Sequence, residues 1–412
     1  MLKRLQNIFN EHLYTVSLYA RQIAGTLVLF LIARYLTVYN FGLFSSYKNI
    51  AAFFFMFANL GFSEYILVSS KANPTEVKLK ISLFLTNAVF IAFLMCFISP
   101  FCAFENVLLF CLVVIRTFFD GTFFSLILPY FQATKKFNII GTINIIYAIC
   151  VSLIAVISYI FKLSLTKFLI LNIVLGFINF IQCSYYAKIN YFLFFNNIKR
   201  FFGLLDKSIF AFMGVTTAYF LYAQVPSLYV STYLPKEQAA LFFSAFTIAT
   251  IVMLLSGAQV QKLVPELIKC SIADAKFLIK KNIVFILKCA AVILIFMLLF
   301  GRIFLELLYG QTYYANANII LIILTIANIC CAEGAIYGAY LTASGRQKKK
   351  IPMQIETTFV TLLGLFVFHK YGVYGAAFAL LCSAIFITIR YILFTRKMIK
   401  QDELKLLEGI KK

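Results

Sequence analysis

The sequence contains few of the residues on which most enzyme chemistry depends. Its 412 residues include no tryptophan, two histidines and 15 acidic residues, against 37 lysines and arginines. With only His12 and His369, most acid–base and metal chemistry based on imidazole is excluded. The sequence has no GxxxxGK[ST] phosphate-binding loop and no polar segment long enough for an ATPase domain. Any uphill transport must therefore use an ion gradient or the gradient of the substrate itself.

The cysteines do not form a recognisable metal-binding or disulfide pattern. Ten of them are scattered singly along apolar segments, apart from the adjacent pair Cys330 and Cys331, and none has CxxC spacing. Metal sites and disulfide frameworks need clustered or regularly spaced cysteines. The sequence therefore predicts packing roles for the cysteines, no metal site and no cofactor.

Long apolar segments fill almost the whole chain. Hydrophobic residues make up 63% of it and charged residues 13%, and about 20 consecutive apolar residues are enough for one helical crossing of a membrane. The runs are continuous, without the strict alternation of membrane β-strands. They predict an all-α integral membrane protein with about 12 transmembrane helices, over residues 13–36, 41–69, 79–99, 107–131, 137–161, 165–187, 208–232, 238–261, 282–305, 316–343, 352–369 and 373–395.

Basic residues cluster in alternate loops. The N-terminal segment and every second loop after it hold 26 of the 37 lysines and arginines, whereas the opposite loops hold six. By the positive-inside rule, both termini are expected in the cytoplasm, and an even number of crossings requires the same. We expect a multi-pass membrane protein. The net charge of +22 then reflects topology and anionic lipid, and no nucleic-acid partner is expected.

The two halves of the chain resemble each other. Residues 35–53 align without gaps with residues 233–251, with seven identities in nineteen positions, although chance similarity between apolar segments is an alternative. A second similarity relates YFQATKK (130–136) to YLTASGR (340–346). Parallel repeats of this kind typically enclose a central site that opens to each side of the membrane in turn. We expect two pseudo-symmetric six-helix lobes, residues 1–200 and 201–412, around a central cavity, with a cytoplasmic linker over 188–207.

Several segments resemble a known family. They are ARYLTVYNFGLFSSYKNI (33–50), LGFSEYILVSS (60–70), ALFFSAFTIATI (240–251), VQKLVPEL (260–267) and LFGRIFLELLYGQTYYANANIILIIL (299–324). Their order and spacing are similar to those of Wzx-type oligosaccharide (O-antigen) flippases, in the polysaccharide transporter family of the multidrug/oligosaccharidyl-lipid/polysaccharide exporter (MOP) superfamily, which also contains the MATE exporters. The chain departs from the family pattern at Thr37 and Val38, where Gly-Pro is common.

This resemblance implies a flippase, not an enzyme. The expected activity is translocation of polyprenyl-diphosphate-linked oligosaccharide units, of the undecaprenyl diphosphate type, for O-antigen or capsule biosynthesis. Alternating access coupled to antiport of a proton or cation is expected, and other polysaccharide-assembly membrane proteins are possible partners. Two alternatives remain open: a MATE-like drug or solute exporter, and an integral-membrane glycan polymerase or transferase.

Three basic residues within the apolar segments are the candidate substrate-binding residues. A diphosphate and its sugars are prohibitive in hydrocarbon, so the cavity must be wet and cationic. Arg21, Lys48 and Arg116 are the candidates, because guanidinium groups form paired hydrogen bonds with phosphate and lysine acts as a point charge. Structural ion pairing of the arginines, or extension of Lys48 to the headgroups, is the alternative for each.

Two acids and one proline complete the candidate set. Asp120 lies four residues after Arg116, so the two either neutralise one another or form a switch in which Asp120 binds the coupling ion. Glu333, in the corresponding crossing of the second half, is a second coupling candidate or an interhelical anchor. Gln224 and Pro226 mark a possible kink that serves either gating or packing.

Overall fold

The computed structural model describes residues 2–59, 74–102, 104–134, 136–189, 207–310 and 312–410. Within these ranges the chain is helical and contains no strand. It divides into two compact units, residues 1–217 (the N unit) and residues 218–412 (the C unit), and one helix crosses the division. The LGFSEYILVSS segment, the predicted boundary at 200/201 and most of the predicted linker lie outside the described residues.

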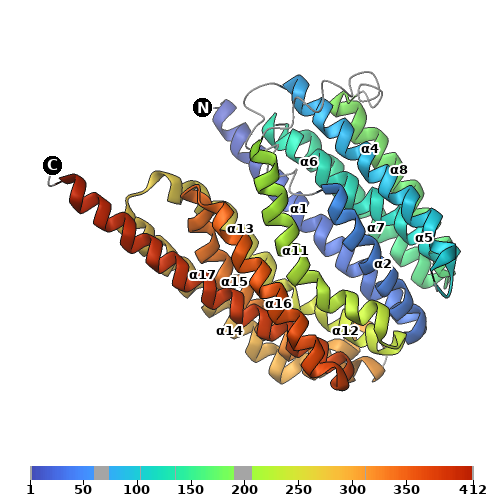
Figure 1. The fold of residues 1–412 in the computed structure, drawn as a ribbon. Coiled ribbons are helices and arrows are strands. Elements are labelled where there is room, and N and C mark those ends of the chain that lie inside the picture. Colours follow the sequence, from blue (N-terminus) through green and yellow to red (C-terminus); the bar gives the residue numbers. More distant parts are fainter. Residues whose placement is uncertain are drawn as a thin grey trace. The chain divides into compact units, whose positions relative to one another are not determined.

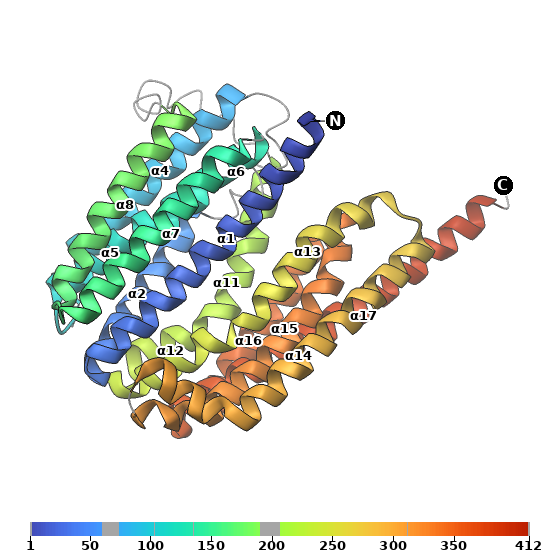
Figure 2. The ribbon, with the colours of Figure 1, turned by 180° about the vertical axis from the view of Figure 1, so that it is seen from behind.

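The described crossings of the N unit are long helices that run in alternating directions (Figures 1 and 2). They are α1 (Leu2–Tyr35), α2 (Val38–Asn59), α4 (Pro74–Ile98), α5 (Val107–Thr117) continued by the π-helical turn η2 (Phe118–Thr122) and α6 (Phe123–Ala133), α7 (Phe137–Ile160) and α8 (Leu165–Ala187). Helix α1 packs along most of α7, while α5 packs between α2 and α8. This places the middle of α1, the π-helical turn and α7 next to one another.

The described crossings of the C unit follow the same scheme. They are the C-terminal part of α11 (Lys207–Tyr233), α12 (Lys236–Ala249) with α13 (Ile251–Lys269), α14 (Ile272–Tyr309), α15 (Asn318–Ala343), α16 (Lys350–Phe368) and α17 (Gly372–Ile410). Helix α15 is central in this unit, because α12, α13, α14 and α17 all pack against it. Its buried side is correspondingly apolar, with Leu321, Leu324, Ala332 and Ile336 inaccessible to solvent.

The predicted crossings agree closely with these helices. Within the described residues, each of the twelve predicted ranges coincides with one helix or with consecutive helical segments, and residues 60–69 of the second range lie outside the described residues. Nine helical stretches of the described residues are long and apolar enough to span a membrane, one of which includes both α16 and α17. The predicted fold class, an all-α multi-pass membrane protein, is therefore confirmed. Two crossings that the sequence predicts as continuous are interrupted, the fourth by the π-helical turn and the eighth at Thr250.

The repeated segments occupy equivalent places in the two units. Helices α1 and α11 end at Tyr35 and Tyr233, and the next helices begin three residues later in both units. Helices α6 and α15 end alike too. The amide of Thr134 bonds the carbonyl of Tyr130 at 2.9 Å, and Ser344 bonds Tyr340 at 2.9 Å. Both pairs of similar segments therefore lie at equivalent helix ends, as a structural repeat predicts.

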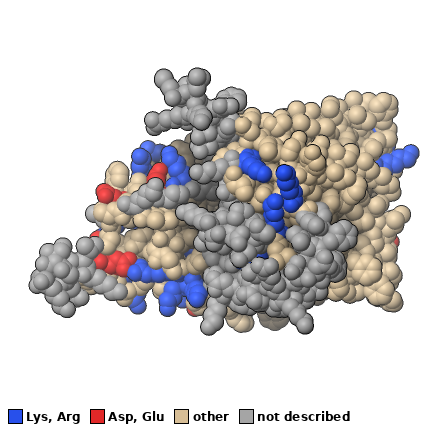
Figure 3. Space-filling view, turned by 90° about the horizontal axis from the view of Figure 1, so that it is seen from above, with Lys and Arg blue, Asp and Glu red and all other residues tan. Residues whose placement is uncertain are grey.

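Polar contacts fix the last turns of α17 to other helices of the C unit. Arg346, between α15 and α16, donates to both carboxylate oxygens of Asp402 at 2.7 and 2.5 Å. Tyr340 also donates to Asp402, at 2.8 Å, and Lys276 of α14 pairs with Glu403 at 2.5 Å. The hydrogen bonds that Arg346 donates to Asp402 hold the pKa of Arg346 above the usual arginine value. Figure 3 looks at the face of the molecule on which these turns lie. On that face, Lys and Arg side chains are more prominent than Asp and Glu side chains.

Candidate functional site

The fourth crossing changes its helical geometry at Asp120. The π-helical turn Phe118–Thr122 has Asp120 at its centre, and the amide of Phe123 bonds the carbonyl of Phe118, five residues back. A π-helical turn adds one residue to a helix and leaves backbone groups available for other partners, and such turns are frequent at functional sites. The turn therefore makes both the carbonyl and the carboxylate of Asp120 available to other helices.

Aromatic packing against α8 supports the π-helical turn. Phe119 makes edge contacts with Phe177 and Phe180 of α8, with ring centroids 5.8 and 5.9 Å apart. Gly176 permits this approach, because a Cβ atom at residue 176 would lie 2.7 Å from the Cβ of Phe119. The small residue on one helix and the bulky ring on the other thus fix the position of Asp120.

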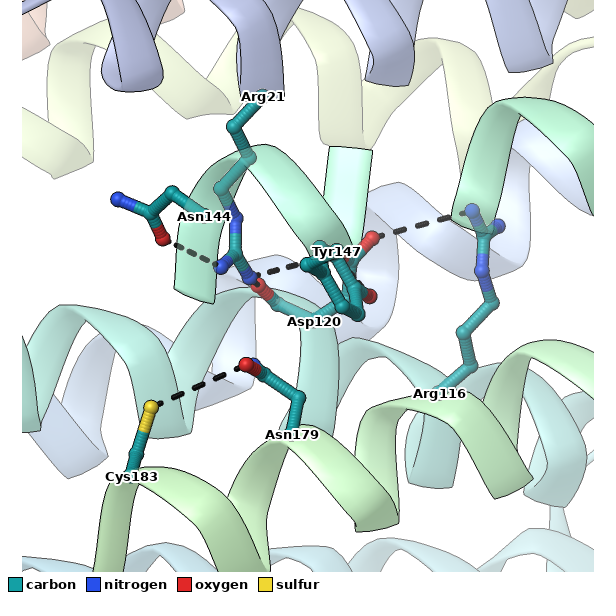
Figure 4. Close-up of polar contacts among 7 residues, drawn as sticks. All are labelled: Arg21, Arg116, Asp120, Asn144, Tyr147, Asn179 and Cys183. Atoms are coloured by element: carbon teal, nitrogen blue, oxygen red, sulfur yellow. Dashed lines mark hydrogen bonds and ion pairs between the residues drawn. The ribbon is translucent and has the colours of Figure 1, made fainter. Parts of the chain in front are cut away.

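Arg21 of α1 reaches Asp120 from across the unit (Figure 4). Its Nη2 donates to the carbonyl of Asp120 at 2.7 Å and lies 3.6 Å from Oδ1 of the carboxylate. Its Nη1 donates to Oδ1 of Asn144 at 3.3 Å, and the guanidinium stacks over the ring of Phe124 at 3.7 Å. Only 12% of the Arg21 side chain is exposed. The sequence-based candidate Arg21 therefore lies in a polar cluster inside the N unit.

Arg116 has few polar contacts for a buried arginine. Its Nη2 lies 3.8 Å from Oδ2 of Asp120, and its guanidinium lies 5.5 and 5.4 Å from the rings of Phe44 and Phe168. Its side chain is 9% exposed, its Nε is buried without a partner, and no hydrogen bond to Arg116 occurs among the described residues. A guanidinium has five N–H donors, and buried donors without acceptors are costly. Arg116 is therefore a buried cation with free capacity to bind an anion.

Lys48 completes an excess of positive charge. It lies in α2, is exposed, and interacts electrostatically with Arg116 and Asp120. In the part of the chain that the structure describes, Lys48 has no ion pair. The N unit thus places Arg21 and Arg116 within 3.8 Å of one carboxylate and Lys48 within electrostatic range of it, as a cluster with a net charge of about +2. If Arg116 and Asp120 only neutralised one another, the presence of Arg21 and Lys48 in the same cluster would have no explanation.

Polar residues of α7 and α8 were not singled out from the sequence. Tyr147 donates to Oδ1 of Asp120 at 2.8 Å, and Asn144 connects Arg21 to Ser17 through a further bond of 3.4 Å. Asn179 accepts a long bond from Cys183, at 3.8 Å, while its buried Nδ2 has no partner in the described structure. The available signal was an amide and a tyrosine three residues apart in a mostly apolar crossing. We include Asn144 and Tyr147 in the candidate site.

Glu333 belongs to the other unit, in α15. It is partly buried, and its electrostatic partner is Arg396 of α17. The adjacent Gly334 allows close packing on α17, since a Cβ at residue 334 would lie 2.9 Å from Oγ1 of Thr388. Counted from the matching helix ends, Asp120 corresponds to Cys330, three residues before Glu333. The two acids therefore lie in corresponding helices, about one turn apart.

Gln224 and Pro226 lie within a continuous helix. Helix α11 includes Pro226 in its interior. Ser227 donates to the carbonyl of Gln224 at 2.8 Å and to its side-chain oxygen at 3.0 Å. Pro226 has no amide hydrogen and therefore removes one backbone hydrogen bond of the helix. The bonds of Ser227 provide polar partners close to that place. The gating role of this segment stays a prediction.

Comparisons with known proteins agree with this architecture. No model of a known protein family matches the sequence. The capsular polysaccharide biosynthesis protein CapF of Staphylococcus aureus is 24% identical over 391 residues, which are 90% of this chain and 95% of CapF. The lipid II flippase MurJ, in an inward closed conformation, superposes with a TM-score of 0.70 at 15% identity, covering 93% of this chain and 87% of MurJ.

An inward-facing multidrug resistance MATE transporter of the MOP superfamily matches with a TM-score of 0.61 at 13% identity, over 92% of this chain and 95% of the transporter. The chain has the fold of these flippase and transporter structures. The resemblance to Wzx-type flippases that the sequence indicated is thereby confirmed. The similar solved structures are those of a flippase and a transporter, in agreement with the expectation that this chain is not an enzyme.

Proposed function

We propose that this protein is a flippase that moves polyprenyl-diphosphate-linked oligosaccharide units from the cytoplasmic to the outer leaflet for surface polysaccharide biosynthesis. The capsule-related relative and the flippase neighbour support a lipid-linked sugar as the substrate class. We place the protein in the bacterial cytoplasmic (inner) membrane with both termini inside. Its substrate is then an undecaprenyl diphosphate conjugate destined for O-antigen or capsule.

The observation that carries this proposal is the unsatisfied positive charge in the N unit. Arg116 is 9% exposed and lacks a hydrogen bond within the described structure, and Lys48 has no ion pair there. A diphosphate supplies several charged acceptor oxygens, and a hydrogen bond to a charged group contributes about 1.5–3 kcal/mol. Binding such an anion would satisfy donors that the protein leaves free.

Asp120 is the proposed switch of this site. Its carboxylate is 40% exposed and lies within 3.8 Å of both arginines, so an incoming diphosphate must compete with it. Protonation of Asp120, or binding of a cation to it, would release Arg21 and Arg116 for the substrate. In this scheme Glu333 is a second coupling group. The Gln224–Pro226 segment is the hinge for alternating access. The two six-helix lobes divide near residue 200, with a linker over 188–207. Other polysaccharide-assembly proteins would supply and polymerise the substrate.

A MATE-like drug exporter is the second candidate, since MATE transporters share the fold. The charge of the site does not favour it for cationic drugs, because the cluster has three cations and one carboxylate. If cells lacking the protein became drug-sensitive with unchanged surface glycan, this second function would replace the first. A glycan polymerase or transferase has no similar support from the proteins that match.

The test is replacement of the site arginines in cells. Arg21→Ala and Arg116→Ala should each abolish surface polysaccharide at normal protein levels, and lipid-linked repeat units should accumulate in the cytoplasmic leaflet. Arg390→Ala is a matched control, because Arg390 also lies in a crossing but pairs at 2.7 Å with Glu356 in the C unit. Retained polysaccharide in the variant with both site changes would refute the proposal.

A further inference from the structure

A separate pocket lies on the N unit where α7 begins and α8 ends. It has a volume of about 730 Å³, within the range of small-molecule sites. Its lining combines apolar and aromatic side chains with two lysines: Lys136, Ile139, Phe180, Ile181, Ser184, Tyr185, Tyr186, Lys188 and Ile189. The sequence predicts this end of the helices to be cytoplasmic. The pocket is therefore expected at the level of the inner-leaflet headgroups.

The two lysines make the rim of this pocket positive. Lys136 precedes the first turn of α7, and Lys188 follows the last turn of α8 in a left-handed conformation, with φ 52°. Lys136 lies 5.8 Å from the ring of Tyr130, and neither lysine has a carboxylate partner among the described residues. Two cations without a carboxylate partner in the described structure, placed about an apolar hollow, match the chemistry of a phosphate group attached to hydrocarbon chains.

The apolar lining continues as exposed stripes along both helices. On α7, Ile146, Ile149 and Leu153 are 49–55% exposed, and on α8, Ile181 and Val174 are 50 and 52% exposed. The α7 positions are three and four residues apart, and the two α8 positions are seven residues apart. Each set therefore lies on one face of its helix. A molecule with its charged group at the lysines can therefore extend its acyl chains along a continuous apolar surface.

We propose that this pocket binds one anionic phospholipid of the inner leaflet, whatever the chain transports. The polar groups of the lining are hydroxyls and amines, without the carboxylates and amides that typically bind sugars, so the sugar-bearing substrate fits it poorly. Lysine near a membrane surface contributes about 1 kcal/mol toward anionic lipid, so the two lysines together account for a roughly 30-fold preference. The tyrosines match the interfacial position of such a headgroup.

The test uses the full chain, delipidated in detergent and titrated with phosphatidylglycerol or phosphatidylcholine, with bound lipids counted by native mass spectrometry. The variant combines Lys136→Gln with Lys188→Asn, since asparagine tolerates the left-handed conformation. A matched control combines Lys162→Asn with Lys167→Gln at the other ends of the same helices, where Lys162 also has a positive φ of 47°.

The proposal predicts that one phosphatidylglycerol binds the unmodified protein, that its Kd rises about 30-fold in the Lys136/Lys188 variant, and that the control leaves it unchanged. Phosphatidylcholine binding should not respond to either pair. An equal loss of phosphatidylglycerol affinity in the Lys136/Lys188 variant and in the control, or no loss in either, would overturn the proposal. So would displacement of phosphatidylglycerol by an equal concentration of inorganic phosphate, or of undecaprenyl phosphate, which would identify a phosphate site or a carrier-lipid site instead.

Discussion

Asp120→Asn should strengthen anion binding while abolishing transport. The substitution removes the charge but leaves most of the local geometry in place. The carbonyl that accepts from Arg21 at 2.7 Å belongs to the backbone, and an amide oxygen can still accept the bond from Tyr147. The variant therefore removes the competition between Asp120 and the substrate without removing a cation.

The expected magnitude follows from the two ion-pair distances. At 3.6 and 3.8 Å, and an effective dielectric constant of about 20, each contact has a Coulomb energy of roughly 4–5 kcal/mol before desolvation. Because the Asp120 side chain is 40% exposed, we reduce this to a net value of about 1 kcal/mol for each pair. Losing both should lower stability by about 2 kcal/mol and tighten diphosphate binding roughly 30-fold.

The assay measures binding and transport separately. The affinity of purified protein for undecaprenyl diphosphate is compared with surface polysaccharide in cells that produce the same variant. Glu356→Gln serves as the control, since Glu356 pairs with Arg390 at 2.7 Å in the C unit. Weaker or unchanged affinity in Asp120→Asn, or normal polysaccharide, would show that Asp120 does not compete with the anion.

Two further substitutions test the packing on which the site and the C unit depend. Gly176→Ala should cost about 1–3 kcal/mol and reduce transport, because its Cβ would lie 2.7 Å from Phe119 beside the π-helical turn. A Cβ atom at residue 25 would have nothing within 4 Å, so Gly25→Ala should leave the melting temperature unchanged or raise it. Equal effects of Gly176→Ala and Gly25→Ala would contradict this account. Asp402→Asn should lower the free energy of unfolding by about 1–3 kcal/mol, and with it the melting temperature, because its ion pair with Arg346 is lost. Since the pKa of Arg346 is raised, its contribution is fully present below the ordinary arginine pKa, so this loss should not vary across neutral pH.

The helix positions and the repeat were predictable because they depend on local patterns. Continuous apolar runs mark crossings, and the matching of Tyr35 with Tyr233 anticipated two equivalent helix ends. Arg116 and Asp120 were also predictable as neighbours, since residues four apart on a helix share a face. Each of these inferences uses sequence separations of a few residues or a direct comparison of two segments.

The partners of Arg21 depend on packing between distant crossings. Arg21 and Asn144 are 123 residues apart in sequence, and no local pattern relates α1 to α7. The π-helical turn was equally out of reach, because its single extra residue leaves the apolar character of the fourth crossing unchanged. What fixes it is the contact of Phe119 with Gly176 on another helix.

The repeat itself argues that the charged cluster is not required by the fold. Aligning the matching helix ends pairs each charged residue of the cluster with an uncharged residue of the C unit: Arg21 with Tyr219, Lys48 with Phe246, Arg116 with Ile326 and Asp120 with Cys330. The C unit forms the corresponding helices without those charges. Because an arginine at the centre of a crossing costs about 2.5–3.5 kcal/mol on insertion scales, a cluster needed only for packing would be replaceable by the residues of the other half. This comparison supports the proposal that the charges of the cluster serve an anionic ligand and not the stability of the bundle.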